Sequence, residues 1–389
     1  MADAIVAARW QFAFTIMFHY LFPVLTMGLG VLIAVLKTLE LRTRDPAYGI
    51  AARFWARIFA ITFATGVVTG IPMEFQFGTN WAAFSHLAGP VVGQTLFMEG
   101  VFAFFAESSF LGVFLFAEKR VSRGLHWLSS IMVALGAVVS GFFIVATNAW
   151  MQHPVGYRMN GGRAELTSLW QLVSNPYARW QYPHVISGSL IVASMVMAGI
   201  AIVGMPDSER RELMDPIVVP GALSYLVYGD FRARVVGLND IPADQQPPVE
   251  IVYYAYHIMV GLGTIFIAVL VLSALLLWRG RLFQSRGTLW VLMLAVPFPY
   301  IANHAGWVVA EVGRQPWVVY GVQRSIEGTS RNVTAGMTYF TLFGFLGLYL
   351  VVGLLYLLLF ARIVNRGPGD EHEPLGSVGT GAAVAEARS

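Results

Sequence analysis

Long apolar runs, separated by short basic loops, fill most of this chain. A helix that crosses a bilayer needs about 20 apolar residues, and eight runs reach that length. They lie at 10–36, 58–77, 94–117, 125–151, 182–205, 251–278, 288–310 and 335–361. Only helices and closed barrels cross a bilayer, and these runs are too long for tilted strands. The pattern predicts an all-α, polytopic transmembrane helix bundle with eight recognisable spans.

The composition agrees with this class. Of the 389 residues, 57% are hydrophobic and only 12% are charged, whereas a soluble chain carries about 25% charged residues. The chain has no cysteine, which excludes disulfides, iron–sulfur clusters, thiolate-bound metals and covalently attached haem of the c type. The expected surroundings are a lipid bilayer, and no nucleic-acid partner is predicted.

The distribution of charge between the loops predicts the orientation, because basic loops stay on the cytoplasmic side. Basic residues gather at 37–57, 119–123, 279–286 and 362–366. Residues 206–250 carry more acidic than basic side chains and are expected to form an outer-face loop. The N-terminus should lie outside and the C-terminus in the cytoplasm. We expect residues 1–366 to form the membrane bundle and 367–389 a disordered cytoplasmic tail.

The same charge pattern reveals a gap. Only three spans lie between the basic loops at 119–123 and 279–286, yet two loops on one side require an even number of crossings. The segment 216–229 has two prolines in fourteen residues and makes a poor span. We therefore predict that one helix is missing and that 204–250 passes through or around the bundle as irregular chain.

The stretch 303–317 closes a long apolar run yet carries His304, Glu311 and Arg314. Ionisable groups at membrane depth are costly and persist mainly beside a buried partner or cofactor. His304 and Glu311 are seven residues apart, which places them on one face of a helix. The alternative is a helix end at the interface, where Glu311 snorkels to water and pairs with Arg314.

Further metal-ligating side chains occur on four other spans. Counted from the outer end, His19 lies about nine residues into the first span. Glu99 and His184 lie near the outer ends of their spans, and Met259 lies about a third of the way into its own. With Glu311, five potential ligands would fall in the outer half of the bilayer. Ordinary helix packing explains each one alone, but their common depth favours a shared function.

The ligand types indicate haem chemistry. A His and Met pair is typical of a low-spin haem used in electron transfer. A lone His or carboxylate leaves one face of a haem open to dioxygen. Glu99 and Glu107 are about 12 Å apart on one helix face, and Ser140 lies near mid-membrane on the next span. Carboxylates leading inward suit a proton relay, although carboxyls bonded to backbone and hydroxyl groups would look the same, and Ser140 alone is an ordinary packing serine.

Several stretches carry a more specific signal. They are Arg-Trp-Gln-Phe-Ala-Phe-Thr (9–15) with His19, Met-Glu-Phe-Gln-Phe-Gly-Thr-Asn-Trp (73–81), Glu99-Gly with Phe-Phe-Ala-Glu-Ser (104–108), Asn-Ala-Trp-Met-Gln (148–152), His184, His257-Ile-Met259-Val-Gly, and Gly306-Trp with Glu-Val-Gly-Arg-Gln-Pro-Trp (311–317). In these stretches, which run nearly from end to end, the chain resembles subunit I of the cytochrome bd-type quinol oxidases.

The resemblance implies a low-spin haem b, a high-spin haem b and a haem d, or a third haem b in place of haem d. It implies that His184 and Met259 bind the low-spin haem iron. His19, Glu99 and Glu311 then serve the two high-spin haems, without a division between them. Glu107 and Ser140, together with Glu99, match proton-route positions. The positions beside the cofactors are matched by Trp307, Arg314, His257 and Arg9.

The implied reaction oxidises membrane quinol and reduces dioxygen to water with protons from the cytoplasm. The implied partners are subunit II and a small single-span subunit, in a bacterial plasma membrane. The family has nine helices, and its sixth helix and the first part of its quinol loop are absent after Val203. A truncated, inactive remnant is one alternative. A haem-free transporter is disfavoured because the sequence has no repeat symmetry. The sequence leaves open whether the quinol is ubiquinol or menaquinol, and it leaves the oligomeric state open.

Overall fold

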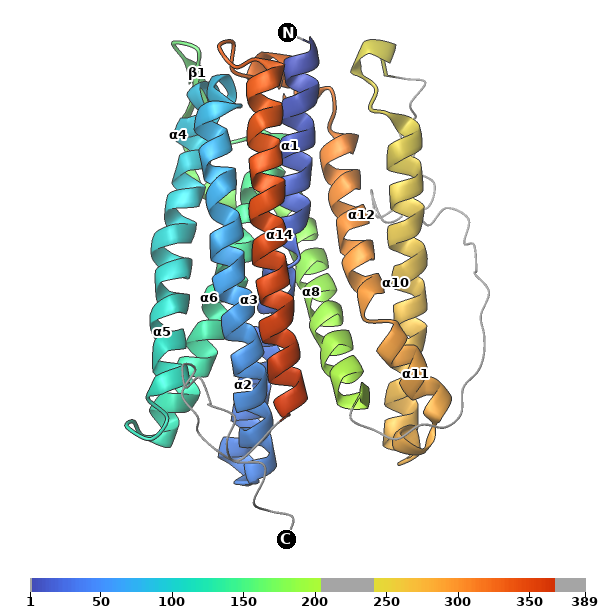
Figure 1. The fold of residues 1–389 in the computed structure, drawn as a ribbon. Coiled ribbons are helices and arrows are strands. Elements are labelled where there is room, and N and C mark those ends of the chain that lie inside the picture. The colour runs from blue at the N-terminus through green and yellow to red at the C-terminus, as the bar shows by residue number, and fades with distance from the viewer. Residues whose placement is uncertain (1, 204–240, 368–389) are drawn as a thin grey trace.

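The computed structural model describes residues 2–203 and 241–367 as a bundle of long helices lying roughly side by side (Figure 1). Residues 1, 204–240 and 368–389 are outside the described part of the chain. The N-terminus and the start of α14 lie at one end of the bundle, named here the upper end (Figure 1). The last residues of α14 lie at the opposite, lower end (Figure 1).

Helices make up most of the described chain. The longer ones are α1 (Ala2–Tyr20), α2 (Pro23–Thr43), α3 (Pro46–Thr79), α4 (Ala82–Met98), α5 (Phe105–Phe116), α6 (Arg123–Gln152), α8 (Pro176–Val203), α10 (Val249–Trp278), α11 (Arg286–Leu294), α12 (Pro297–Gly313) and α14 (Ala335–Arg366). The shorter elements are the π-helix η1 (Glu99–Phe104), α7 (Leu169–Val173), η3 (Ala243–Gln245), η4 (Leu282–Gln284), α13 (Ser325–Gly328) and the strands β1 (Tyr157–Asn160), β2 (Arg163–Leu166), β3 (Trp317–Val319) and β4 (Gln323–Arg324).

The predicted transmembrane class is confirmed. In the described part of the chain, seven helical segments are long and apolar enough to cross a bilayer. The pair α11 and α12, which meet at a bend of 41°, together make an eighth. These eight segments follow the order of the eight predicted spans.

The helices extend well beyond several of the predicted apolar runs. The second predicted span, 58–77, belongs to the longer segment Pro46–Thr79, and the third, 94–117, belongs to Ala82–Phe116. An apolar run marks the part of a helix that lipid covers, whereas the helix itself begins where a cap satisfies its first N–H groups. Asp45 supplies that cap for α3 by accepting a hydrogen bond of 2.9 Å from the Ala47 N–H.

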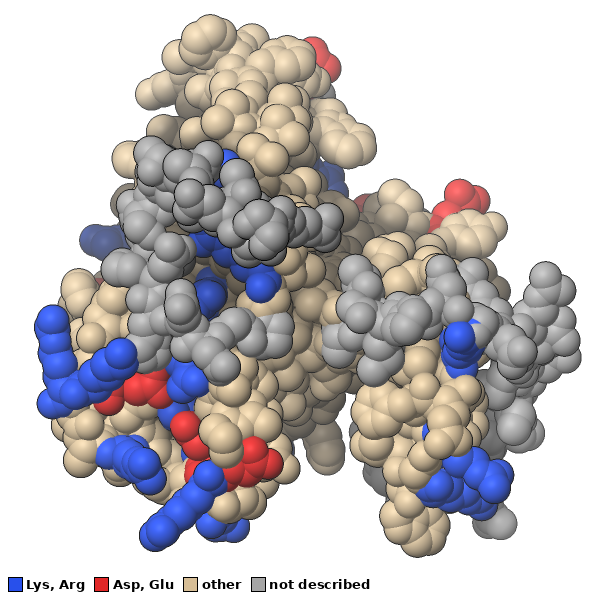
Figure 2. All heavy atoms as spheres, turned by 60° about the horizontal axis from the view of Figure 1, so that its bottom comes forward, with Lys and Arg blue, Asp and Glu red and all other residues tan. Residues whose placement is uncertain are grey.

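The basic loops gather at one end, as the charge pattern predicts. Figure 2 looks onto the lower end and shows Lys and Arg side chains around it. The connections that follow α2, α5 and α10 and the last turn of α14 all lie there (Figure 1). Each of these three connections and the last turn of α14 carries an exposed basic residue: Arg44, Lys119, Arg279 and Arg366.

The helices α8 and α10 both run from the upper end to the lower end (Figure 1). The chain after Val203 therefore leaves α8 at the lower end and returns to Val249 at the upper end. This direction keeps Met259 in the upper half and the basic loop after α10 at the lower end, as the charge rule requires. The predicted missing helix and the irregular path of 204–250 fall mostly outside the described residues.

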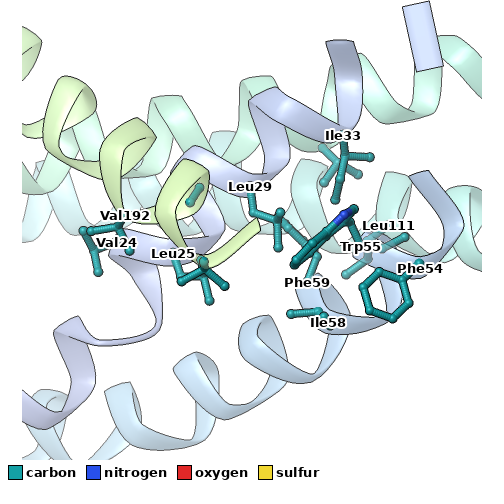
Figure 3. Packing of buried hydrophobic residues seen from close by; sticks show 14 of the residues in the cluster. Val24, Leu25, Leu29, Ile33, Phe54, Trp55, Ile58, Phe59, Leu111 and Val192 are labelled. Carbon is teal, nitrogen blue, oxygen red and sulfur yellow. The ribbon is translucent and has the colours of Figure 1, made fainter. Parts of the chain in front are cut away.

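The main apolar core lies between α2, α3, α5 and α8 in the lower half of the bundle. Leu25 and Leu29 of α2 lie beside Ile58 and Phe59 of α3, and Val192 of α8 lies close to Val24 (Figure 3). These side chains are almost completely buried. Because lipid tails are as apolar as these residues, close van der Waals packing holds such helices together in a membrane.

Gly28 allows the closest approach of α2 to α8. A Cβ at Gly28 would overlap the backbone carbonyl of Ser189 and approach the Ala193 side chain to 2.8 Å. We expect Gly28→Ala to destabilise the fold by about 1–3 kcal/mol through overpacking, measured by unfolding in mixed micelles. Gly112→Ala is the control, because nothing lies within 4 Å of a Cβ there. The interpretation fails if both variants unfold at the same denaturant concentration.

Two small hairpins close the upper end. β1 pairs antiparallel with β2 through a turn at Gly161 and Gly162, whose φ angles are +54° and +78°. Positive φ at both turn residues suits glycine and matches the twist of a two-residue hairpin. The second hairpin, β3 with β4, packs into the apolar cluster that includes Trp150 and Phe84. Its first strand follows α12 directly, so it fixes the end of that helix.

A group of charged side chains links the lower ends of α2 and α3 to the loop after α5. Lys37, only 5% exposed, pairs with Glu40 and lies 3.5 Å from the Glu118 carboxylate. Arg53 pairs with the same carboxylate at 3.2 Å. Burial acts to raise the pKa of Glu118, but Lys37, Arg53 and His126 outweigh it, and the pKa lies below its usual range. The group therefore remains ionised and links α2, α3 and the loop after α5.

Candidate functional site

One broad side of α6 organises the carboxylates of the site. Ser140 of α6 donates a hydrogen bond of 2.6 Å to Glu99 Oε1. Glu99 is the first residue of the π-helix η1, an irregularity that is frequent at functional sites because it re-aims side chains. The sequence placed Ser140 on the adjacent span as a relay candidate, and the structure brings the two residues together.

Glu107 meets α6 one turn closer to the lower end. A Cβ at Gly136 would lie 2.7 Å from the Glu107 Cβ, so the glycine makes room for the acidic residue. Gly136 and Ser140 are four residues apart and share a helix face. Glu107 is only 4% exposed, and its Oε1 has no hydrogen-bond partner in the described part of the chain. A buried carboxyl oxygen without a partner is costly and indicates a place for a water or a transferable proton.

Glu311, at the end of α12, is held from two sides. Asn148 of α6 donates a hydrogen bond of 2.5 Å to Glu311 Oε1, and Arg314 donates one of 2.6 Å to Oε2. Gln152 in turn donates to Asn148 at 2.5 Å, and Gln181 donates to Gln152 at 2.7 Å. Glu311 therefore faces α6 of the bundle, while 23% of its side chain remains exposed. Its predicted pairing with Arg314 is present.

Arg314 provides the test of whether a haem fits. The residue is 7% exposed, and its Nε and Nη1 have no protein partner among the described residues, although Nη2 pairs with Glu311. A buried guanidinium with two unpartnered nitrogens, which carry three N–H groups, calls for a second anion. Haem carries two propionate carboxylates, and a planar carboxylate suits the guanidinium. The arrangement at Arg314 and Glu311 therefore fits a haem edge.

His19 stands near the end of α1, 17 residues after Ala2, where the helix breaks at Leu21 and Phe22 before α2 begins. Its Nδ1 is 3.1 Å from the Thr69 hydroxyl oxygen of α3. Glu99 lies 17 residues, or about 25 Å, after Ala82, the first residue of α4. Both helices begin well before their apolar runs, and the depth of the two residues in the bilayer stays a prediction.

His184 and Met259 lie at similar depths, as predicted. They stand eight residues after Pro176 and ten residues after Val249, and both helices start at the upper end. One apolar cluster below them contains Ile191 and Met195 of α8 with Leu262 and Phe266 of α10. His184 precedes Ile191 by seven residues, and Met259 precedes Phe266 by seven, so each stands on the helix face that enters this shared cluster.

A glycine receives the Met259 side chain. A Cβ at Gly306 of α12 would lie 3.1 Å from the Met259 sulfur. One turn before it on α12, Asn303 lies against Gly188 of α8, where a Cβ would be 2.7 Å from Oδ1. These small residues let α12 lie close to both α8 and α10. The helix α12, which carries Glu311, thus lies between α8, which carries His184, and α10, which carries Met259.

Of the remaining predicted site residues, one faces the interior of the bundle and two are exposed. Trp307 lies edge-on to Tyr20 of α1, with 5.6 Å between ring centroids, so it faces the interior. His257 is exposed, and its Nδ1 lies 2.8 Å from the Tyr253 carbonyl oxygen of its own helix. Two residues turn a helix by about 200°, so His257 points away from the face of Met259. Arg9 is exposed near the upper end of α1, ten residues from His19.

Sequence reasoning did not assign roles to several residues that complete the site. They are Thr69 beside His19, Asn148, Gln152 and Gln181 beside Glu311, and Tyr20, which contacts Trp307 and Asn303. The four-residue spacing of Asn148 and Gln152 was a usable signal, because polar amides at i and i+4 inside a span are expensive. Within the described ranges, no three His, Cys, Asp or Glu residues form a cluster that could hold a metal ion.

Comparison with known proteins gives a consistent result. The family profile described as "Cytochrome bd terminal oxidase subunit I" matches residues 7–208 and 200–368. The chain is 32% identical to cytochrome bd ubiquinol oxidase subunit 1 of Bacillus subtilis over 445 residues, with 95% of each chain covered. It is 26% identical to cytochrome bd-II ubiquinol oxidase subunit 1 of Escherichia coli, covering 95% of this chain and 98% of that protein. Its fold resembles a chain of the bd oxidase of Geobacillus thermodenitrificans, with a TM-score of 0.83, 28% identity, and 94% and 99% of the two chains covered.

The alignment with the Bacillus subtilis protein is longer than this chain. The alignment with the Bacillus subtilis protein spans 445 residues, whereas 95% of the 389 residues here is about 370, so roughly 75 positions lack a counterpart in this chain. The two matches of the family profile overlap at 200–208. This is where the predicted gap after Val203 falls.

Proposed function

The chain belongs to the cytochrome bd terminal oxidase subunit I family, and from this premise we propose that it takes electrons from a membrane quinol and reduces dioxygen to water. The two curated relatives described above carry the name ubiquinol oxidase, and a third, 26% identical, is named a putative menaquinol oxidase subunit, which supports a quinol oxidoreductase of this type. The eight membrane-length segments suit a donor that dissolves in lipid.

We infer that the bundle holds three haems, whose irons supply electron transfer and dioxygen binding. His184 and Met259 would hold a low-spin haem b through one nitrogen and one sulfur donor. His19, Glu99 and Glu311 would hold a high-spin haem b and a haem d, or a third haem b. The free Nε and Nη1 of Arg314 would bind a propionate, and Trp307 would pack beside the same group.

The observation that carries this proposal is the buried clamp on Glu311. Asn148 and Arg314 fix both carboxylate oxygens at hydrogen-bond distance, and the buried Nε and Nη1 of Arg314 have no partner among the described residues. Such donors suit a second anion beside Glu311. A transporter would not require a His and Met pair at matched depth.

The decisive experiment is a reduced-minus-oxidised absorption spectrum of the purified protein, combined with a haem assay by chemical extraction. The proposal predicts one low-spin and two high-spin haems per chain. Preparations from cells with adequate haem supply that contain no haem would contradict the proposal and favour the haem-free alternative.

Protons for the reaction would pass along α6. Glu107 and Glu99 contact adjacent turns of that helix, at Gly136 and at Ser140, and Glu107 lies nearer the basic lower end. The unpartnered Glu107 oxygen is suited to accept a proton, and the Ser140 hydroxyl can pass one to Glu99. These residues would hold and move protons and need not touch a haem iron, Glu99 excepted.

Glu107→Gln tests this route. The amide preserves the size of the side chain but cannot carry a proton, so we expect oxygen consumption to fall about 100-fold with haem content unchanged. Glu165→Gln is the matched control, because Glu165 lies in the upper hairpin and pairs with Arg158 at the surface. Unchanged oxygen consumption in Glu107→Gln would remove Glu107 from the route.

The gap after Val203 favours a second possibility, a chain that binds haem yet oxidises quinol poorly. It is supported by the roughly 75 unmatched positions, the overlap of the profile matches at 200–208, and the common direction of α8 and α10 (Figure 1). Oxygen consumption driven by a soluble quinol analogue should be compared with that driven by a small artificial reductant. A truncated remnant of this kind would respond only to the artificial reductant.

We also propose the assembly and the orientation. Subunit 1 of a bd oxidase functions with subunit II, and a small single-span subunit is proposed as a further partner in a bacterial plasma membrane. The exposed apolar faces of α14 and α10 suit lipid and partner helices. The basic lower end would face the cytoplasm, which places the N-terminus outside; reporter fusions at residues 240 and 283 test this.

A further inference from the structure

We propose that Thr69 is a positioning residue that fixes the ring tautomer of His19 and thereby presents Nε2 to a haem iron. The proposal rests on the function proposed above, in which His19 is a haem ligand. Thr69 lies outside the sequence stretches quoted above for the family resemblance. The proposal also predicts which ring nitrogen of His19 binds the iron.

The hydrogen bonds of the Thr69 hydroxyl carry the inference. Its oxygen is 3.1 Å from His19 Nδ1, and the hydroxyl donates to the Thr65 carbonyl at 2.9 Å, with the Gly66 carbonyl at 3.1 Å. A hydroxyl has a single proton, and a helical threonine directs it to a carbonyl of the preceding turn. The side of the oxygen that faces His19 is then a lone pair, so Nδ1 must carry the proton.

The tautomer decides which ring nitrogen is free. With the proton on Nδ1, the Nε2 of a neutral imidazole keeps its lone pair, which is the form that binds a metal. An oriented hydrogen bond from the non-ligating nitrogen is the usual way in which proteins hold a metal-binding histidine.

A series of hydrogen bonds between α1 and α3 keeps His19 opposite Thr69. Above it, Gln76 donates to the Thr15 hydroxyl at 3.0 Å. Still nearer the upper end, Asn80 donates to Gln11 at 2.5 Å. Gln11, Thr15 and His19 recur every four residues and lie on one face of α1. The first two pairs are almost completely buried, and a slip of one helix against the other would break every pair.

The Thr69 backbone is itself fixed. Tyr349 of α14 donates a hydrogen bond of 2.6 Å to the Thr69 carbonyl, and both residues are fully buried. The next residue, Gly70, lets the His19 ring lie against the helix, because a Cβ there would be 3.2 Å from the ring Cε1. The ring is thus held both by the hydroxyl and by the surface of α3.

The experiment compares three variants in the haem-loaded protein. Thr69→Val keeps the shape and removes the acceptor. Thr69→Ser keeps the hydroxyl. Thr62→Val is the matched control, since Thr62 is equally buried on α3 but contacts Tyr356 rather than His19. The readouts are the iron–histidine stretching band in resonance Raman spectra of the reduced protein and the rate of haem transfer to excess apomyoglobin.

We expect Thr69→Val to shift or broaden the iron–histidine band and to speed haem loss about tenfold. Thr69→Ser and Thr62→Val should resemble the unmodified protein. Equal effects in Thr69→Val and Thr62→Val would mean that hydroxyl loss acts only through packing and would overturn the inference. An unchanged band in Thr69→Val would overturn it as well.

His19→Ala separates this inference from the proposed function. If His19→Ala keeps the iron–histidine band, His19 is not the ligand, and the proposed haem assignment fails together with the role of Thr69. If His19→Ala loses the band while Thr69→Val matches the unmodified protein, only the role of Thr69 is refuted.

Discussion

Met259→Leu is expected to abolish the low-spin haem signal while the two high-spin haems persist. Leucine fills a similar volume beside Gly306 but has no sulfur to bind iron, so the haem held by His184 would lose its sixth ligand. A five-coordinate haem is high-spin and has a lower potential. Low-temperature absorption and electron paramagnetic resonance spectra of the purified protein measure the change directly.

Met195→Leu provides the control for this experiment. Met195 is fully buried in the apolar cluster below the proposed haem, so its replacement tests packing without removing a proposed ligand. Such volume-conserving changes cost less than about 1.5 kcal/mol, and the low-spin signal should remain. A normal low-spin signal in Met259→Leu would exclude Met259 from the site and leave His184 to be paired with another residue.

Arg314→Met is expected to produce the largest loss of stability. The Arg314 side chain is 4% exposed and that of Glu311 23%, and they pair at 2.6 Å. Removing one partner of a buried ion pair leaves a buried charge uncompensated, which costs about 3–5 kcal/mol. The proposed propionate contact would disappear at the same time, so haem content should fall together with the melting temperature.

Arg158→Met is the matched control for Arg314→Met. Arg158 pairs with Glu165 at 3.1 Å, but the two side chains are 70% and 36% exposed. Exposed pairs are screened by water and contribute little, so this variant should melt like the unmodified protein. If Arg314→Met also retained its stability and haem, the ion pair of Arg314 with Glu311 would not be needed for haem binding. That result would contradict the main argument for the proposed function.

The starts of α1 and α4 show how far a linear sequence informs about a helix. Their apolar runs begin at 10 and 94, whereas the helices begin at Ala2 and Ala82. Polar residues at the upper end do not stop a helix, since backbone hydrogen bonding continues until a cap or turn intervenes. The run that begins at 251 lies close to Val249, the first residue of α10, so there the sequence and the structure agree.

Hydropathy and charge along the chain were enough to identify the class of protein, the order of its membrane-length helices and the end on which the basic loops gather. These features depend on local composition, which hydropathy and charge report directly. Which polar groups meet depends on how the helices pack: Ser140 meets Glu99, Asn148 and Arg314 meet Glu311, and Thr69 meets His19. Each residue turns a helix by about 100°, so small differences in start, rotation or register between two packed helices change every contact across them. It was for the same reason that His257, two residues from Met259, faced away from it.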